Sequence, residues 1–160
     1  MPAYWLEALV VLLGLFLLVI EAFYSPSSKE LVRRAAIGGL VLILVTLYFA
    51  EAPAASNAEL ARFYIYDSAA IFFKTLALLT TILVLFMAYD YRRVLNRFTE
   101  DPDTEYGTGE YYVLPVFACA GMMWMASARD LVSIFVALEL VTITFYILVS
   151  FMRRQVGSLE

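Results

Sequence analysis

Residues 130–151 read DLVSIFVALELVTITFYILVSF, a largely apolar run with a single acid, Glu139, near its centre. About 20 apolar residues in a helix suffice to cross a hydrocarbon layer roughly 30 Å thick. At 1.5 Å per residue, Glu139 lies roughly 13 Å along this helix from Asp130, where its short side chain reaches neither interface. A carboxylate at that depth costs about 2.5–3.5 kcal/mol on insertion scales, and such residues usually mark ion or proton pathways. The alternative is a protonated Glu139 that makes a structural hydrogen bond between helices.

The rest of the chain shares this apolar character. Of its 160 residues, 63% are hydrophobic, and the mean hydropathy is +0.81. Soluble domains are about 45–50% apolar, so this composition predicts an all-α, polytopic membrane protein whose first partner is the lipid bilayer. The chain has no histidine and one cysteine, Cys119, which excludes an internal disulfide, a histidine-ligated haem and a Cys/His zinc site. A net charge of −4 spread over the loops predicts no nucleic-acid partner.

Five apolar runs predict five transmembrane helices in a single membrane region, residues 1–160. They lie near residues 4–23, 35–49, 68–88, 111–128 and 130–151. The first run lacks a basic N-terminal region and a cleavage site, so we expect a retained helix rather than a signal peptide. Eight Lys and Arg residues fall on one set of alternate loops and two on the other, which predicts an external N-terminus and a cytoplasmic C-terminus. The acidic segment 99–110 is then a solvated cytoplasmic loop.

Glu139 has polar neighbours on its own helix. Thr142 and Tyr146 follow it by three and seven residues, so their hydroxyls share its face and can help to solvate a proton there. Burial favours the neutral acid, whereas a nearby cation favours the carboxylate. A carboxyl group held between these two effects can take up and release a proton when its surroundings change.

Lys74 is the second ionisable residue inside a predicted helix. It lies two turns past Asp67 on roughly the same face, in the half of the membrane nearer the outside. Four roles stay open: a direct part in proton transport, electrostatic support of the proton path, a snorkelling side chain, and an ion pair with Asp67. Glu7 and Glu21 lie near the two ends of the first predicted helix, and neither is predicted to be a site residue.

Several stretches carry a resemblance to a known family. They are GEYYVLP (109–115), GMMWMASARD (121–130), FVALELVTITFY (135–146) and GSLE (157–160), preceded by DSAAIFFK (67–74). In this order they resemble the antiporter-like membrane subunits of respiratory complex I, the NADH–quinone oxidoreductase, and among them the subunit N family. The resemblance runs from about Asp67 to the last residue, whereas the first two predicted helices match only in pattern.

The resemblance implies a multi-pass subunit of the bacterial inner membrane that translocates protons, driven by quinone reduction elsewhere in the complex. In this family the acid matched by Glu139 pairs with a lysine on the seventh helix, which lies outside this chain. Cofactors are not expected here, because NADH, FMN, the iron–sulfur clusters and quinone bind other subunits. The expected partners are the other membrane subunits of complex I. The chain ends at Glu160, where the sixth helix would begin, so it resembles the N-terminal third of such a subunit.

The sequence is also compatible with two other functions. One is a component of a related cation/proton antiporter complex, outside respiration. The other is a purely structural role, in which the helices dock onto a larger membrane arm and Glu139 is only a polar link between helices.

Overall fold

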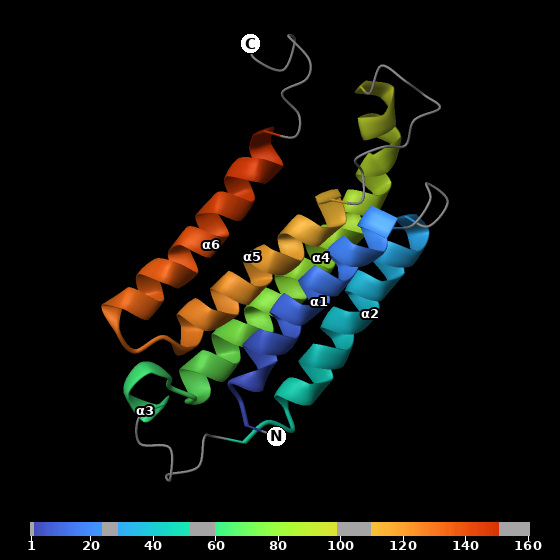
Figure 1. Cartoon of the computed structure of the whole chain (residues 1–160). Coiled ribbons are helices and arrows are strands. Elements are labelled where there is room, and N and C mark those ends of the chain that lie inside the picture. Colours follow the sequence, from blue (N-terminus) through green and yellow to red (C-terminus); the bar gives the residue numbers. More distant parts are fainter. Residues whose placement is uncertain (1, 24–28, 52–59, 99–109, 151–160) are drawn as a thin grey trace.

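Helices are the main secondary structure of the residues that the computed structural model describes: 2–23, 29–51, 60–98 and 110–150 (Figure 1). Apart from the helices, these residues form two isolated β-bridges. The helices are α1 (Trp5–Phe23), α2 (Lys29–Leu47), α3 (Leu60–Phe63), α4 (Ser68–Phe98), α5 (Glu110–Ser127) and α6 (Leu131–Ser150).

Three segments are long and apolar enough to cross a membrane by length and composition: Trp5–Phe23, Ser68–Ala88 and Leu131–Ser150. The apolar part of α5, Tyr111–Ser127, is shorter. Backbone N–H and C=O groups find no water in a hydrocarbon layer, so a helix, which satisfies them internally, is the form that such sequences adopt there. The predicted all-α class is therefore confirmed, and three of the five predicted spans coincide with helices of membrane length.

Two helices extend further than their apolar runs. α2 begins at Lys29 rather than near residue 35, and α4 continues to Phe98, ten residues past Ala88. Both extensions are rich in charged residues and contain neither glycine nor proline, and Lys, Arg and Glu are good helix formers in water. Hydropathy locates the apolar part of a helix and says little about how far its polar ends continue. Apart from Glu110, the segment 99–110 lies outside the described residues.

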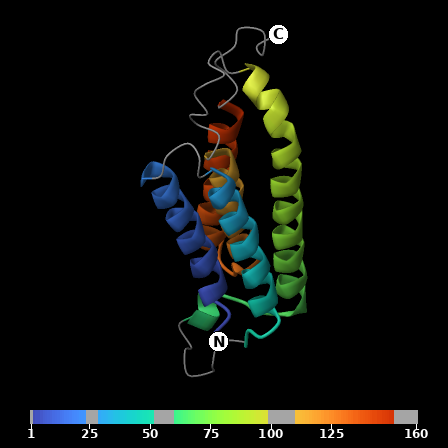
Figure 2. The same cartoon turned by 90° about the vertical axis from the view of Figure 1, so that its right-hand side faces the viewer.

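The five long helices alternate in direction and pack as a bundle in which α5 is central. It contacts α6, α4, α1 and α2, whereas α6 has α5 as its main neighbour and lies at the edge of the bundle (Figure 1). Figure 2 shows α1, α2 and α4 side by side, with α3 at the same end of the bundle as the start of α1. Leucine, valine and alanine side chains of α1, α2, α4 and α5 form one buried core.

Glycines allow close approach where α5 meets its neighbours. A Cβ atom at Gly121 would lie 2.7 Å from Val141 Cγ2 and 3.0 Å from the backbone oxygen of Ala137 on α6. A Cβ at Gly14 on α1 would lie 2.9 Å from the Phe117 ring of α5. Small residues at such positions let helices approach closely, which is how helices gain packing energy inside a membrane.

Gly121→Ala is therefore expected to destabilise the fold by about 1–3 kcal/mol, because the new methyl group meets fixed backbone of α6. Gly38→Ala is the matched control, since nothing lies within 4 Å of a Cβ there. The control should be neutral or gain up to about 1 kcal/mol, because alanine favours helix over glycine. Thermal unfolding of the two variants in the same detergent checks the difference, and equal midpoints would contradict the close α5–α6 contact.

Candidate functional site

Lys74 is completely buried, and its partner is an acid on another helix. Its Nζ atom on α4 lies 2.6 Å from Glu7 Oε1 on α1, and the two side chains are 0% and 8% exposed. Pairing with Asp67, one of the possibilities open from the sequence, does not occur. Asp67 instead caps α4, where its Oδ1 accepts a hydrogen bond from the Ala70 N–H at 2.7 Å. Snorkelling is also wrong, because a fully buried ammonium group does not reach solvent.

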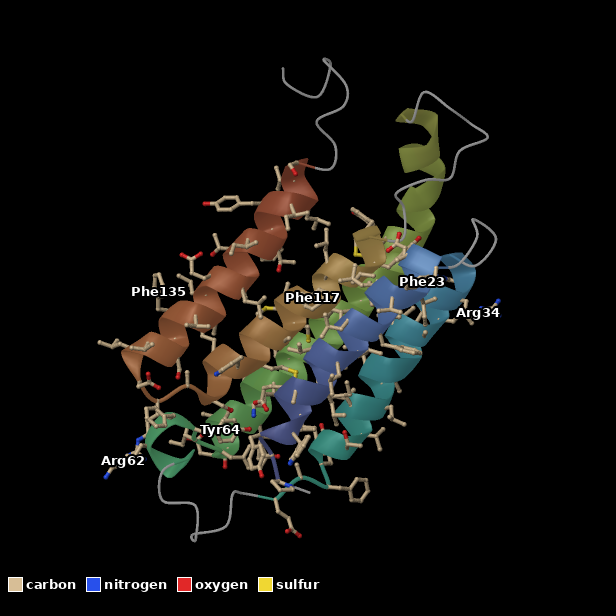
Figure 3. The ribbon with its side chains drawn as sticks, viewed as in Figure 1. Phe23, Arg34, Arg62, Tyr64, Phe117 and Phe135 are labelled. Carbon is tan, nitrogen blue, oxygen red and sulfur yellow. The ribbon has the colours of Figure 1, made fainter. Side chains whose placement is uncertain are left out.

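Tyr64, which lies between α3 and α4 (Figure 3), bridges the two charges. Its hydroxyl accepts a hydrogen bond from Lys74 Nζ at 2.7 Å and donates to Glu7 Oε1 at 3.1 Å. The ring of Tyr66 adds an aromatic contact, with its centroid 5.1 Å from Lys74 Nζ. The Tyr66 hydroxyl points elsewhere and donates to the backbone oxygen of Leu47 at 3.1 Å.

Backbone pairing holds Tyr64 in place. The Ile65 N–H donates to the Ser127 carbonyl at 2.9 Å, and the Arg129 N–H donates to the Phe63 carbonyl at 3.1 Å. These bonds form a short antiparallel bridge between the segment after α3 and the turn between α5 and α6. The bridge joins Tyr64 to the same turn from which α6 begins.

The chemistry of this cluster follows from its burial. Removal from water raises the pKa of the Tyr64 hydroxyl above its ordinary value, and the negative charge of Glu7 raises it further. The hydroxyl therefore keeps its proton and acts as a donor to the carboxylate. Lys74, Tyr64 and Glu7 form a continuous hydrogen-bonded path between a cation and an anion, through a group that can both accept and donate a proton.

The turn between α5 and α6 adds two buried polar atoms. Ser127 is fully buried, and its Oγ forms no hydrogen bond with any residue in the described part of the chain. The same holds for Asp130 Oδ1, whereas Asp130 Oδ2 accepts from the Ser133 N–H at 2.9 Å and caps α6. Buried polar atoms without a partner are uncommon in native folds.

Glu139 lies on the outer face of α6, far along the helix from this cluster. Its side chain is exposed, and no side chain within residues 2–23, 29–51, 60–98 and 110–150 pairs with it. The Thr142 hydroxyl donates to its own helix, to the carbonyl of Leu138 at 2.8 Å. Tyr146 is 70% exposed, and Phe135, one turn before Glu139, projects away from the bundle (Figure 3).

The predicted site residues thus fall in two places. Glu139, Thr142 and Tyr146 lie along α6, and Lys74 lies inside the bundle with Glu7 and Tyr64. Sequence reasoning missed Glu7 and Tyr64. The available signal was Lys74 itself, because a lysine inside an apolar helix requires a nearby anion. Nothing in the sequence identified Glu7 as that anion rather than Asp67.

Together, the fold and these buried ionisable groups define a helical membrane protein of the kind that carries charged side chains inside an apolar bundle. No family model matches the chain. Individual relatives do: it is 40% identical over 155 residues to NADH-quinone oxidoreductase subunit N of Heliobacterium modesticaldum, and 32% identical over 154 residues to that of Rhodospirillum rubrum. A third relative, subunit N 2 of Chloroherpeton thalassium, is 35% identical over 153 residues.

By sequence the chain is therefore a relative of NADH-quinone oxidoreductase subunit N, and the predicted resemblance to that subunit is confirmed. The alignments with the Heliobacterium and Rhodospirillum subunits cover 96% of this chain. The similarity therefore extends to α1 and α2, where the sequence by itself matches the subunit N family only in pattern. The chain spans about 30% of the length of these relatives.

Proposed function

We propose that this chain is part of a membrane subunit of a proton-translocating NADH–quinone oxidoreductase. Two observations support the proposal: the sequence relation to subunit N and the membrane-length helices α1, α4 and α6. The chain contributes no redox chemistry of its own. NADH, FMN, the iron–sulfur clusters and quinone bind other subunits of the complex.

Glu139 is the residue that we propose to carry the proton, and its place on α6 is the observation on which this proposal depends. Only 11% of the apolar window of α6 is buried against the rest of the described chain, and Glu139 lies on the uncovered part. A carboxyl group in an apolar layer needs a cation or a hydrogen-bond donor. The proposed partner is a lysine from a part of the subunit outside this chain. Tyr146 and Thr142 flank Glu139 on the same helix as polar neighbours.

A structural role is the second candidate, and it is favoured for Lys74. Its ammonium group is buried inside the bundle and bonded to Glu7 and Tyr64. Lys74 is therefore not available to Glu139, and its direct effect is to join α1 and α4. The two candidates differ in their prediction for Glu139→Gln: the proton-carrying role requires a loss of pumping in a complex that still assembles.

Purification of the tagged subunit from its native membranes tests the proposed membership. We expect hydrophilic NADH-oxidising subunits and other membrane subunits to copurify, and mass spectrometry identifies them. Copurification with cation/proton antiporter components and without NADH-oxidising subunits would overturn the proposal.

The proposed topology has five spans, with the N-terminus outside and the C-terminus in the cytoplasm. It predicts that Arg62→Cys, next to the exposed end of α3, reacts with a membrane-impermeant maleimide in intact cells. Glu105→Cys, in the opposite loop, should react only after the membrane is opened. The parent chain is the control, since Cys119 is fully buried and should stay unlabelled. The reverse pattern would invert the topology.

A further inference from the structure

The cluster of Glu7, Tyr64, Lys74 and Ser127 has no part in the proton-carrying role proposed for Glu139. It brings together α1, the segment before α4, α4 itself and the end of α5. Three of the four groups are joined in a chain of contacts of 2.6–3.1 Å. A purely apolar bundle would gain as much packing energy without them, since buried ion pairs are often no better for stability than well-packed hydrophobic residues.

The buried hydroxyl of Ser127 is separate evidence for a polar site beside the ion pair. This hydroxyl is fully buried, beside the backbone bond from Ile65 to the Ser127 carbonyl, and has no hydrogen-bond partner among the described residues. The Oδ1 atom of Asp130, on the same turn, also lacks one. A bound water needs two to four polar partners, and Ser127, Tyr64 and Asp130 are candidates at this end of the bundle.

We propose that this cluster is a proton-binding site separate from Glu139, in which a water molecule at Ser127 connects the Glu7–Tyr64–Lys74 path to the turn between α5 and α6. Glu7 is the group that accepts the proton. The Lys74 ammonium group already carries its proton, so the carboxylate of Glu7 is the member of the pair that can take up another one.

The proton transfer balances when one proton enters from the bulk solution. Lys74 passes one proton to the Tyr64 oxygen, and Tyr64 passes its own proton to Glu7 Oε1, which leaves a neutral amine and a neutral carboxylic acid. The water at Ser127 takes up one proton from the bulk solution and passes one proton to the amine through Tyr64, so the water itself is left unchanged. The net result is the uptake of one proton, with Lys74 cationic and Glu7 neutral.

In the described part of the chain, Glu7 meets charged and titratable groups from the segment before α4 and from α4 itself. From the segment before α4, Tyr64 and Tyr66 face the pair, and α4 supplies Lys74. On the side of α5 the nearest acid in sequence is Asp130, three residues past Ser127 on the turn to α6. With one cation and one anion in direct contact, a proton on Glu7 changes the net charge of the cluster from zero to plus one.

Infrared difference spectra of the complete subunit in its purified complex test the proposal. Spectra at acidic and alkaline pH are subtracted for the wild type and for Glu7→Gln. A protonated buried carboxyl group gives a C=O stretching band, which we expect in the wild type at acidic pH and expect to be lost in Glu7→Gln. A wild-type difference spectrum with the same carboxyl bands as the variant would overturn the proposal, because Glu7 would then stay ionised.

Glu7→Gln leaves Lys74 without its counter-charge and can unfold the bundle, so a milder pair of variants is needed. Ser127→Ala and Tyr64→Phe each remove one oxygen atom of the proposed path. Each should slow the shift of the Glu7 band after transfer to D₂O by about tenfold, a loss equal to roughly one hydrogen bond. Tyr66→Phe is the matched control, because its hydroxyl bonds Leu47 outside the path, and it should exchange at the wild-type rate. Equal rates in all three variants would overturn the proposed route through Tyr64 and Ser127.

Discussion

Lys74→Met should lower the free energy of unfolding by about 3 kcal/mol. Breaking a buried ion pair by removing one partner typically costs about 3–5 kcal/mol, because the remaining charge is left uncompensated. The expected loss lies at the lower end of this range, since Glu7 keeps the Tyr64 hydroxyl as a hydrogen-bond donor. Thermal unfolding of the subunit in detergent, or the fraction that assembles into the complex, measures the effect.

Two further variants show whether the loss belongs to the ion pair. Removing both charges in Glu7→Gln/Lys74→Met should recover most of the stability, because no unpaired charge remains. Thr75→Ala, one residue along α4, should cost no more than about 1 kcal/mol, because its hydroxyl only bonds the Ile71 carbonyl of its own helix. If the double variant were as unstable as Lys74→Met alone, lost packing rather than the unpaired charge would be the cause.

Glu139→Gln should abolish most of the proton pumping coupled to NADH oxidation while the complex still assembles. The amide keeps the size and hydrogen-bonding capacity of the side chain but cannot take up and release a proton at neutral pH. Loss of a positioned acid–base group typically lowers the rate of a proton transfer step by about 10²–10⁴-fold, so we expect a loss of about tenfold or more. Proton uptake by inverted membrane vesicles, measured beside NADH oxidation, gives the coupled rate.

The control for this experiment is an acid on the surface of the bundle. Glu51→Gln changes an exposed carboxyl group at the end of the bundle and should leave pumping within about twofold of the wild type. Assembly is followed by the amount of intact complex in the membrane. Unchanged pumping in an assembled Glu139→Gln complex would favour the structural role, in which Glu139 is only a polar link between helices.

The fold class could be predicted from hydropathy alone, because each long helix contains an apolar run and the bilayer permits few alternatives to a helix. The predicted α1, 4–23, agrees with the observed Trp5–Phe23 to within one residue, since the helix and its apolar run have nearly the same length. The start of α2 at Lys29 and the end of α4 at Phe98 could not be predicted in the same way. There the helix continues through charged residues, and its ends depend on local helix propensity and tertiary contacts.

The candidate site residues also differ in how much the sequence could predict about them. Glu139 could be located from the sequence because its depth depends only on its position along the helix. It lies nine residues into a helix of known rise, so its distance from the start of that helix is known. The sequence could not predict that the face of α6 with Glu139 is exposed, because exposure depends on which helices pack beside α6. Its predicted neighbours Thr142 and Tyr146 follow from helical spacing, yet only the structure revealed that the Thr142 hydroxyl bonds its own backbone.

By itself, the sequence determined that this chain is an apolar, all-helical membrane protein with two ionisable residues, Lys74 and Glu139, that need an explanation. Only the tertiary structure decided the partner of Lys74. Glu7 is 67 residues away along the chain, and Tyr64 reaches the pair through a backbone bridge to the α5–α6 turn. Ion pairing depends on distance in space, and no local pattern records which distant helices become neighbours when the apolar faces pack.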